Sequence, residues 1–64
     1  MWYFTTHGTG PGTLPKDVSV LKVEEGVNSK GTMGDWVKTS RPLTQEEIKY
    51  YDYREVKIDW IKIA

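Results

Sequence analysis

One short stretch of this chain, LTQEEI at residues 43–48, is a complete signal for the start of an α-helix. Thr44 and Glu47 have the spacing of a capping box, in which each side chain accepts a hydrogen bond from the backbone N–H of the other residue. Leu43 and Ile48 have the spacing of a hydrophobic staple across the same helix end. We therefore predict a helix that begins at Thr44 and runs to about Tyr53.

The size and composition of the chain restrict how it can be stabilised. Its 64 residues fit a single small domain spanning 1–64, and a domain of this size buries only ~60% of the surface that its unfolded chain exposes. The chain has no cysteine and one histidine, so we expect no disulfide and no structural metal. Three Trp, four Tyr and one Phe predict stabilisation by aromatic packing, with self-association as the alternative.

The charge pattern weakens two classes of function. Nine basic residues balance nine acidic ones and are interspersed with them, whereas a protein that relies on phosphate contacts usually has a basic excess. No apolar run approaches the ~20 residues that span a bilayer, so we expect no membrane partner. The first residues lack the features of a signal peptide, and we expect a cytoplasmic protein.

Four segments have the composition or alternation of β-strands. They are 2–6, 18–23, 32–39 and 55–63, with a continued helix as the alternative for the last segment. Residues 28–31 (NSKG) indicate a turn that joins the second and third strands in a hairpin. Apolar residues occur on both faces of 18–23, which indicates two covered faces or a bulge near Val20 and Leu21.

These elements predict an α+β fold: a small antiparallel sheet of three to four strands with one short helix on a face. The alternative is an SH3-like β half-barrel with the helix as an appendage. Gly34 indicates a bulge or a close backbone approach within the third strand. The predicted core consists of Tyr3, Val18, Val20, Val23, Trp36, Val37, Leu43, Ile48, Tyr51, Val56, Ile58 and Trp60.

The loop HGTGPG at residues 7–12 resembles a phosphate-binding loop only in its glycine content. It lacks the glycine spacing of a dinucleotide fingerprint and the Gly-Lys-Ser/Thr of a nucleotide-binding loop. We interpret it as a tight crossover that uses positive φ angles. His7, Gly8, Gly10 and Gly12 remain a secondary candidate site, because a histidine beside a loop can be exposed and reactive. No local signature links His7 to an orienting partner, so we predict neither an enzyme nor a cofactor.

The main candidate site is the stretch KYYDYR at residues 49–54. On a helix with Ile48 at the centre of its buried stripe, Tyr50 and Tyr53 lie on the opposite, outward face. Their rings then either pack on another part of the same chain, such as the C-terminal segment or the glycine-rich loop, lie flat on the surface, or face a partner. Tyrosine and arginine are common anchors of protein interfaces, which favours a non-catalytic module that binds a protein partner or itself. The alternative is a nucleic-acid-binding protein that stacks bases on Tyr50 and Tyr53 and holds phosphates with Lys49 and Arg54.

Two stretches carry a resemblance to other proteins. The segments 7–18, with its glycines and prolines, and 41–52 (RPLTQEEIKYYD) resemble short uncharacterised proteins of Gram-positive bacteria and their phages or mobile elements. The resemblance covers about a third of the chain. It implies a small accessory protein that acts through binding, and it carries over no functional residue.

Overall fold

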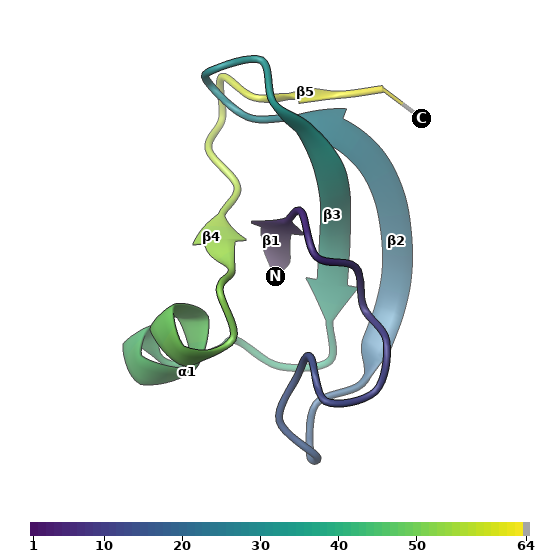
Figure 1. The fold of residues 1–64 in the computed structure, drawn as a ribbon, viewed down its shortest axis with the longest axis vertical. Helices are drawn as coiled ribbons and strands as arrows, with labels where there is room; N and C mark the ends of the chain where they lie inside the picture. The colour runs from purple at the N-terminus through teal and green to yellow at the C-terminus, as the bar shows by residue number, and fades with distance from the viewer. Residues whose placement is uncertain (64) are drawn as a thin grey trace.

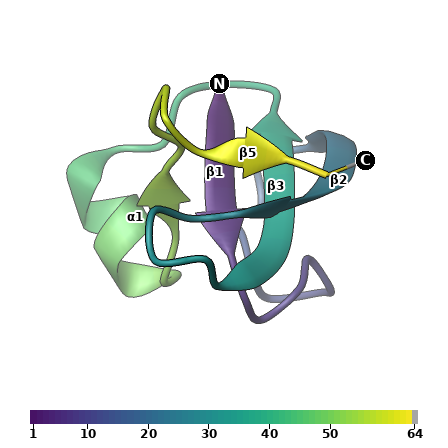
Figure 2. The ribbon, with the colours of Figure 1, turned by 90° about the horizontal axis from the view of Figure 1, so that it is seen from above.

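The fold is a curled five-stranded antiparallel sheet with one short helix, an α+β architecture compatible with an SH3-like half-barrel (Figure 1). The computed structural model describes residues 1–63. The elements are β1 Trp2–Thr5, β2 Val20–Val27, β3 Met33–Thr39, α1 Gln45–Tyr50, β4 Arg54–Glu55 and β5 Ile61–Lys62. The strand order is β4-β1-β3-β2-β5, and Figure 2 shows β5 running beside the end of β2, with which it pairs in the antiparallel sense.

The predicted hairpin between the second and third strands is confirmed as β2 and β3. The Asn28 side chain closes the turn by accepting hydrogen bonds from the backbone N–H groups of Lys30 and Thr32, at 2.9 and 3.0 Å. The predicted bulge is also present, because the register shifts between Val20 and Lys22. From Lys22 to Val27, beyond the bulge, this register brings alternate residues of β2 and their β3 partners to the same face.

The helix begins as predicted, at Thr44. The Glu47 N–H donates to Thr44 Oγ1 at 3.1 Å, and the Thr44 N–H donates to Glu47 Oε1 at 2.9 Å, so the capping box is complete. Arg41 holds Glu47 in place with two further hydrogen bonds of 2.9 Å and also binds the Asp17 carboxylate at 2.9 and 3.0 Å. The hydrogen bonds from Arg41 lower the pKa of Glu47 to about 2. One guanidinium thus ties the start of the helix to the loop before β2.

The helix ends at Tyr50, three residues before the predicted end. Asp52 has a φ of 59°, and the Tyr53 N–H donates to the Ile48 carbonyl at 2.9 Å, which is the helix-terminating turn usually made by glycine. The turn takes Tyr53 off the helical periodicity. The prediction that Tyr50 and Tyr53 share an outward face is therefore wrong.

The predicted strand 55–63 is two short strands at opposite edges of the sheet. β4 pairs with β1 and β5 pairs with β2, so the chain must cross from one edge to the other between them. It does so through a turn in which the Trp60 N–H donates to the Lys57 carbonyl at 3.1 Å. The strand count is accordingly five, and the predicted three to four is too low.

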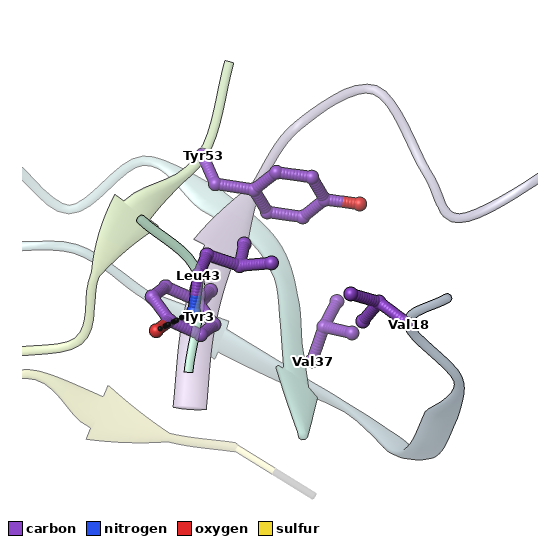
Figure 3. Packing of buried hydrophobic residues seen from close by; sticks show 5 residues of the cluster. All are labelled: Tyr3, Val18, Val37, Leu43 and Tyr53. Atoms are coloured by element: carbon purple, nitrogen blue, oxygen red, sulfur yellow. Dashed lines mark hydrogen bonds between the residues drawn. The ribbon is translucent and has the colours of Figure 1, made fainter. Parts of the chain in front are cut away.

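The core lies on one face of the sheet, between β1, β3 and the segment that carries α1. We call it the helix face; its buried cluster is Tyr3, Val18, Val37, Leu43 and Tyr53 (Figure 3). The Leu43 N–H donates to the Tyr3 hydroxyl at 2.8 Å, a bond drawn in Figure 3. Because successive strand residues alternate, Phe4 and Trp36 lie on the other face, which we call the tryptophan face.

The predicted core is confirmed in part. Tyr3, Val18, Val37 and Leu43 are buried, whereas Val20, Val23 and Ile58 are exposed. Val20 and Val23 lie beside the register shift in β2, and Ile58 lies in the turn at 57–60, so all three fall outside the buried cluster. Trp36, Trp60, Ile48, Tyr51 and Val56 are partly buried, and the buried hydrophobic residues that were not predicted are Phe4 and Tyr53.

Candidate binding surface

The two tyrosines predicted to form one site are separated by the fold. Tyr50 is 81% exposed, and Tyr53 is 2% exposed. The Tyr53 ring meets Tyr3 and His7 edge to face, with ring centroids 6.5 and 5.1 Å apart. Burial raises the pKa of Tyr53. Tyr53 is therefore a core residue. Tyr50 lies on the surface, where its ring centroid is 4.8 Å from that of the neighbouring Tyr51.

The two predicted basic residues come together in a hollow between α1 and β4. Lys49, Arg54 and Lys57 line this space of about 630 Å³, and the acids Asp52 and Glu55 also line it, so its charged groups have an excess of one base. Tyr50 lies elsewhere, at a hollow on the other side of α1. Within residues 1–63, Lys49, Arg54 and Lys57 form no ion pair. This basic hollow retains the predicted cations, whereas the exposed tyrosine lies outside it.

A second hollow on the tryptophan face was not predicted as a site. It has a volume of about 670 Å³, and its apolar lining residues are Met1, Trp2, Trp36, Val56, Ile58 and Trp60. All three indoles are partly exposed, and the Ile58 side chain is fully exposed. We call this space the tryptophan hollow. It shares Trp60 and Lys57 with the basic hollow, so the two adjoin.

Aromatic contacts fix the walls of the tryptophan hollow. The Trp60 ring packs edge to face on Phe4 of β1, with centroids 5.4 Å apart, and so holds the 57–60 turn against the sheet. Trp2 and Trp36 come from adjacent strands, and their ring centroids are 6.5 Å apart. The sequence contained a signal for this arrangement, because Trp2 and Phe4 alternate with the core residue Tyr3.

Two glycines make room for these rings. The Trp36 indole lies directly over Gly26 of β2, where an added Cβ would overlap the ring. Gly34 allows the β3 backbone to approach the Thr5 carbonyl and the Phe4 ring, which an added Cβ would meet at 2.6 and 2.7 Å. The predicted close backbone approach at Gly34 is confirmed. Both glycines therefore serve the tryptophan face.

The charges at the rim of the tryptophan hollow are balanced. Lys62 binds the Glu24 carboxylate at 2.7 Å, and its ammonium lies 6.0 Å from the centre of the Trp2 ring. Two hydrogen bonds lower the pKa of Glu24: the one from Lys62 has the larger effect, and the one from Lys22 the smaller. The remaining rim charges are one base, Lys57, and one acid, Glu55. The hollow is thus apolar with a neutral rim.

The glycine loop gives His7 a structural role. His7 Nδ1 lies 2.8 Å from the Gly8 carbonyl oxygen, and Nε2 lies 2.6 Å from the Tyr51 carbonyl oxygen. The imidazole thus links the glycine loop, through Nδ1 and Gly8, to the end of α1, through Nε2 and Tyr51. Gly8 and Gly12 have φ angles of 81° and 84°, as predicted for a tight crossover, and Gly10 and Gly12 line a shallow hollow within the loop.

The chain matches no protein-family model, no curated protein and no solved structure. Among residues 1–63, no helix has the length and apolar character that crossing a bilayer requires. The candidate surface therefore has to be interpreted from its own geometry and charge.

Proposed function

We propose that this chain is a non-catalytic binding module that binds a protein partner through the tryptophan hollow. The observation that carries the proposal is the convergence of three partly exposed tryptophans and the fully exposed Ile58 on one open space. Tryptophan is enriched among the residues that dominate binding energy at protein interfaces, where it sits in pockets closed to water by its neighbours. A small accessory protein, as the sequence resemblance implies, would act through such a surface.

The shape of the hollow favours an extended segment of the partner. The space of about 670 Å³ lies between the rings of Trp2 and Trp36 on one side and the 56–60 segment on the other. Sites of this size and composition bury most of an inserted apolar group, and a few polar groups at the rim fix its orientation. The occupant is thus an apolar part of the partner, with the charged groups of Glu55 and Lys57 at the rim to orient it.

The balanced rim favours a protein over a nucleic acid. Polyanion binding depends on releasing counterions by neutralising phosphates. At the tryptophan hollow Lys62 is already paired with Glu24, and Glu55 opposes Lys57. The second candidate, nucleic-acid binding, draws its support from the adjoining basic hollow, where Lys49, Arg54 and Lys57 lie near Trp60.

The test is a selection of binders from a random peptide display library, followed by titration of each selected peptide. We expect the peptides to shift the indole N–H signals of the three tryptophans in NMR spectra. Ile58→Asp should weaken binding about tenfold or more, because it places a charge on the apolar wall without removing core packing. Leu21→Asp is the matched control, since Leu21 is exposed on β2 outside the hollow.

Three outcomes decide between the alternatives. The protein-binding proposal is wrong if no selected peptide shifts the indole signals, or if both Asp variants bind equally well. A titration with single-stranded oligo(dT) at low salt tests the second candidate. Salt-sensitive binding that is lost in Lys49→Glu/Arg54→Glu would replace the protein partner with nucleic acid.

A further inference from the structure

Part of the helix face extends beyond the buried cluster. In the β2–β3 ladder, Val27 lies directly opposite Met33, and in the β2–β5 ladder it lies opposite Ile61. The Ile63 N–H donates to the Glu25 carbonyl at 2.8 Å, which continues the β5 pairing by one residue. Directly paired residues point to the same face of a sheet. Three adjacent strands therefore present one row of apolar side chains on this face.

These side chains form an exposed apolar patch. Met33 is 60% exposed, Ile61 64% and Ile63 52%, and Val23, two residues before Glu25 on the same face, is also exposed. We call this surface the outer patch: Val23, Val27, Met33, Ile61 and Ile63. Contiguous exposed apolar surface on a small protein marks an interaction site more often than scattered apolar residues do.

Two carboxylates lie within the outer patch. Glu25 and Asp35 are direct cross-strand partners in the β2–β3 ladder and point to the same face as Val27 and Met33. Neither forms an ion pair with another part of residues 1–63. Like charges directly opposite each other on a sheet are destabilising. The chain thus keeps an unfavourable acidic pair next to exposed apolar side chains.

We propose that the outer patch binds a partner protein segment that places a lysine or arginine against Glu25 and Asp35. Apolar side chains on either side of that cation would pack on Met33, Ile61 and Ile63. The cation removes the repulsion between the two carboxylates and forms charge-assisted hydrogen bonds with them. The outer patch lies on the opposite sheet face from Trp36, so this inference is independent of the tryptophan hollow.

The same charges oppose a second copy of this chain as the occupant. A two-fold contact through the outer patch would face Glu25 and Asp35 of one copy with the same residues of the other. Four carboxylates would then share one partly desolvated contact, and such an arrangement is costly near neutral pH. The charge of the patch therefore selects a basic partner over self-association.

The probes are two synthetic seven-residue peptides that differ at the central residue. One has arginine between two leucines, and its twin has glutamate at that position; both are titrated into the full chain while the backbone amide signals of Met33 and Ile61 are followed by NMR. We expect the arginine peptide to bind roughly tenfold or more tightly than its twin. Glu25→Gln/Asp35→Asn should abolish that preference.

A matched variant separates local from overall charge. Glu46→Gln/Asp59→Asn removes two exposed acids elsewhere and changes the net charge equally, so it should keep the preference for the arginine peptide. The proposal is overturned if the arginine peptide does not bind at about 1 mM. It is also overturned if the preference survives in Glu25→Gln/Asp35→Asn, or if sedimentation shows a dimer at neutral pH that Ile61→Ser dissociates. Ile58→Asp should leave this binding unchanged, so the outcome is independent of the tryptophan hollow.

Discussion

The two faces of the sheet differ in how completely the rest of the chain covers them. On the helix face, Tyr3 and Val37 are sealed by Leu43 and Tyr53, and Arg41 ties the covering segment to the loop before β2. On the tryptophan face, Trp2 and Trp36 are covered only by the 56–63 segment, which leaves a hollow. The same strands supply both faces through residue alternation. The difference therefore arises from what crosses each face.

The hydrogen bonds of the two faces differ in the same way. The Tyr3 hydroxyl fixes Leu43 through a buried bond on the helix face. On the tryptophan face, the buried Trp36 indole N–H has no acceptor within residues 1–63. The segment that covers the tryptophan face is tied at both ends, because β4 pairs with β1, β5 pairs with β2 and Lys62 binds Glu24. Between these strands, the 57–60 turn is held to the sheet by the packing of Trp60 on Phe4. We infer that this turn is the part of the tryptophan face that directional bonds restrain least.

The largest expected effect comes from Tyr53→Ala. Removing a large buried ring should lower the free energy of unfolding by about 3–5 kcal/mol, enough to unfold many domains of this size. Tyr50→Ala, on the exposed ring nearby, should change it by no more than about 0.5 kcal/mol. Urea unfolding followed by circular dichroism measures both. Equal effects of the two variants would contradict the separation of these tyrosines.

Gly26→Ala should give the next largest effect, on the tryptophan face. The added methyl overlaps the Trp36 indole, so the ring must move, at a cost of about 1–3 kcal/mol. The Trp36 indole signal should shift in NMR spectra at the same time. Gly10→Ala is the control, because a Cβ at Gly10 meets nothing within 4 Å and its φ is not positive. An unshifted Trp36 signal would show that the ring does not lie over Gly26.

Tyr3→Phe and Tyr53→Phe test the buried hydroxyls on the helix face. Tyr3→Phe leaves the buried Leu43 N–H without its acceptor and should cost about 1–2 kcal/mol of unfolding free energy. Tyr53→Phe should be close to neutral, since its buried hydroxyl has no hydrogen-bond partner among the described residues. Chemical unfolding of the pair distinguishes them. A larger loss for Tyr53→Phe than for Tyr3→Phe would refute this assignment.

The smallest expected effect is a pH dependence from Glu47. Its folded-state pKa of about 2 lies below the ordinary 4.5, so its contribution to stability is present above pH 4.5 and is lost as the pH falls toward 2. Arg41→Ala should reduce that loss, because the first cause of the low pKa is removed. Thermal unfolding between pH 2 and 6 tests both proteins. Identical pH profiles would mean that Arg41 does not set this pKa.

Much of the fold could be predicted from short sequence patterns. The capping box at Thr44, the β2–β3 hairpin and the close approach at Gly34 each depend on residues near in sequence or on backbone sterics. The early end of α1 was not predicted because the residue with the helix-terminating positive φ is Asp52, whereas this position is usually marked in the sequence by a glycine. The turn at 57–60 was missed because its residues include neither glycine nor proline.

The candidate site was harder to predict than the fold. Tyr53 was placed outside because its position was calculated on a helix that ends three residues earlier. The sequence predicts Trp36 and Trp60 in the core because large rings usually fill the core of a small domain, whereas it makes no prediction for Trp2. Their exposure depends on how the 56–63 segment crosses the sheet, and this crossing is set by contacts such as Phe4 with Trp60, which are distant in sequence.

The short strands at both edges of the sheet have a consequence for behaviour in concentrated solution. β4 and β5 have two residues each, and the part of β2 that β5 leaves uncovered includes the bulge between Val20 and Lys22. Each edge of the sheet therefore offers few aligned backbone N–H and C=O groups with which a strand of another chain could pair. Despite its many exposed apolar side chains, the protein is thereby guarded against growth into fibrils.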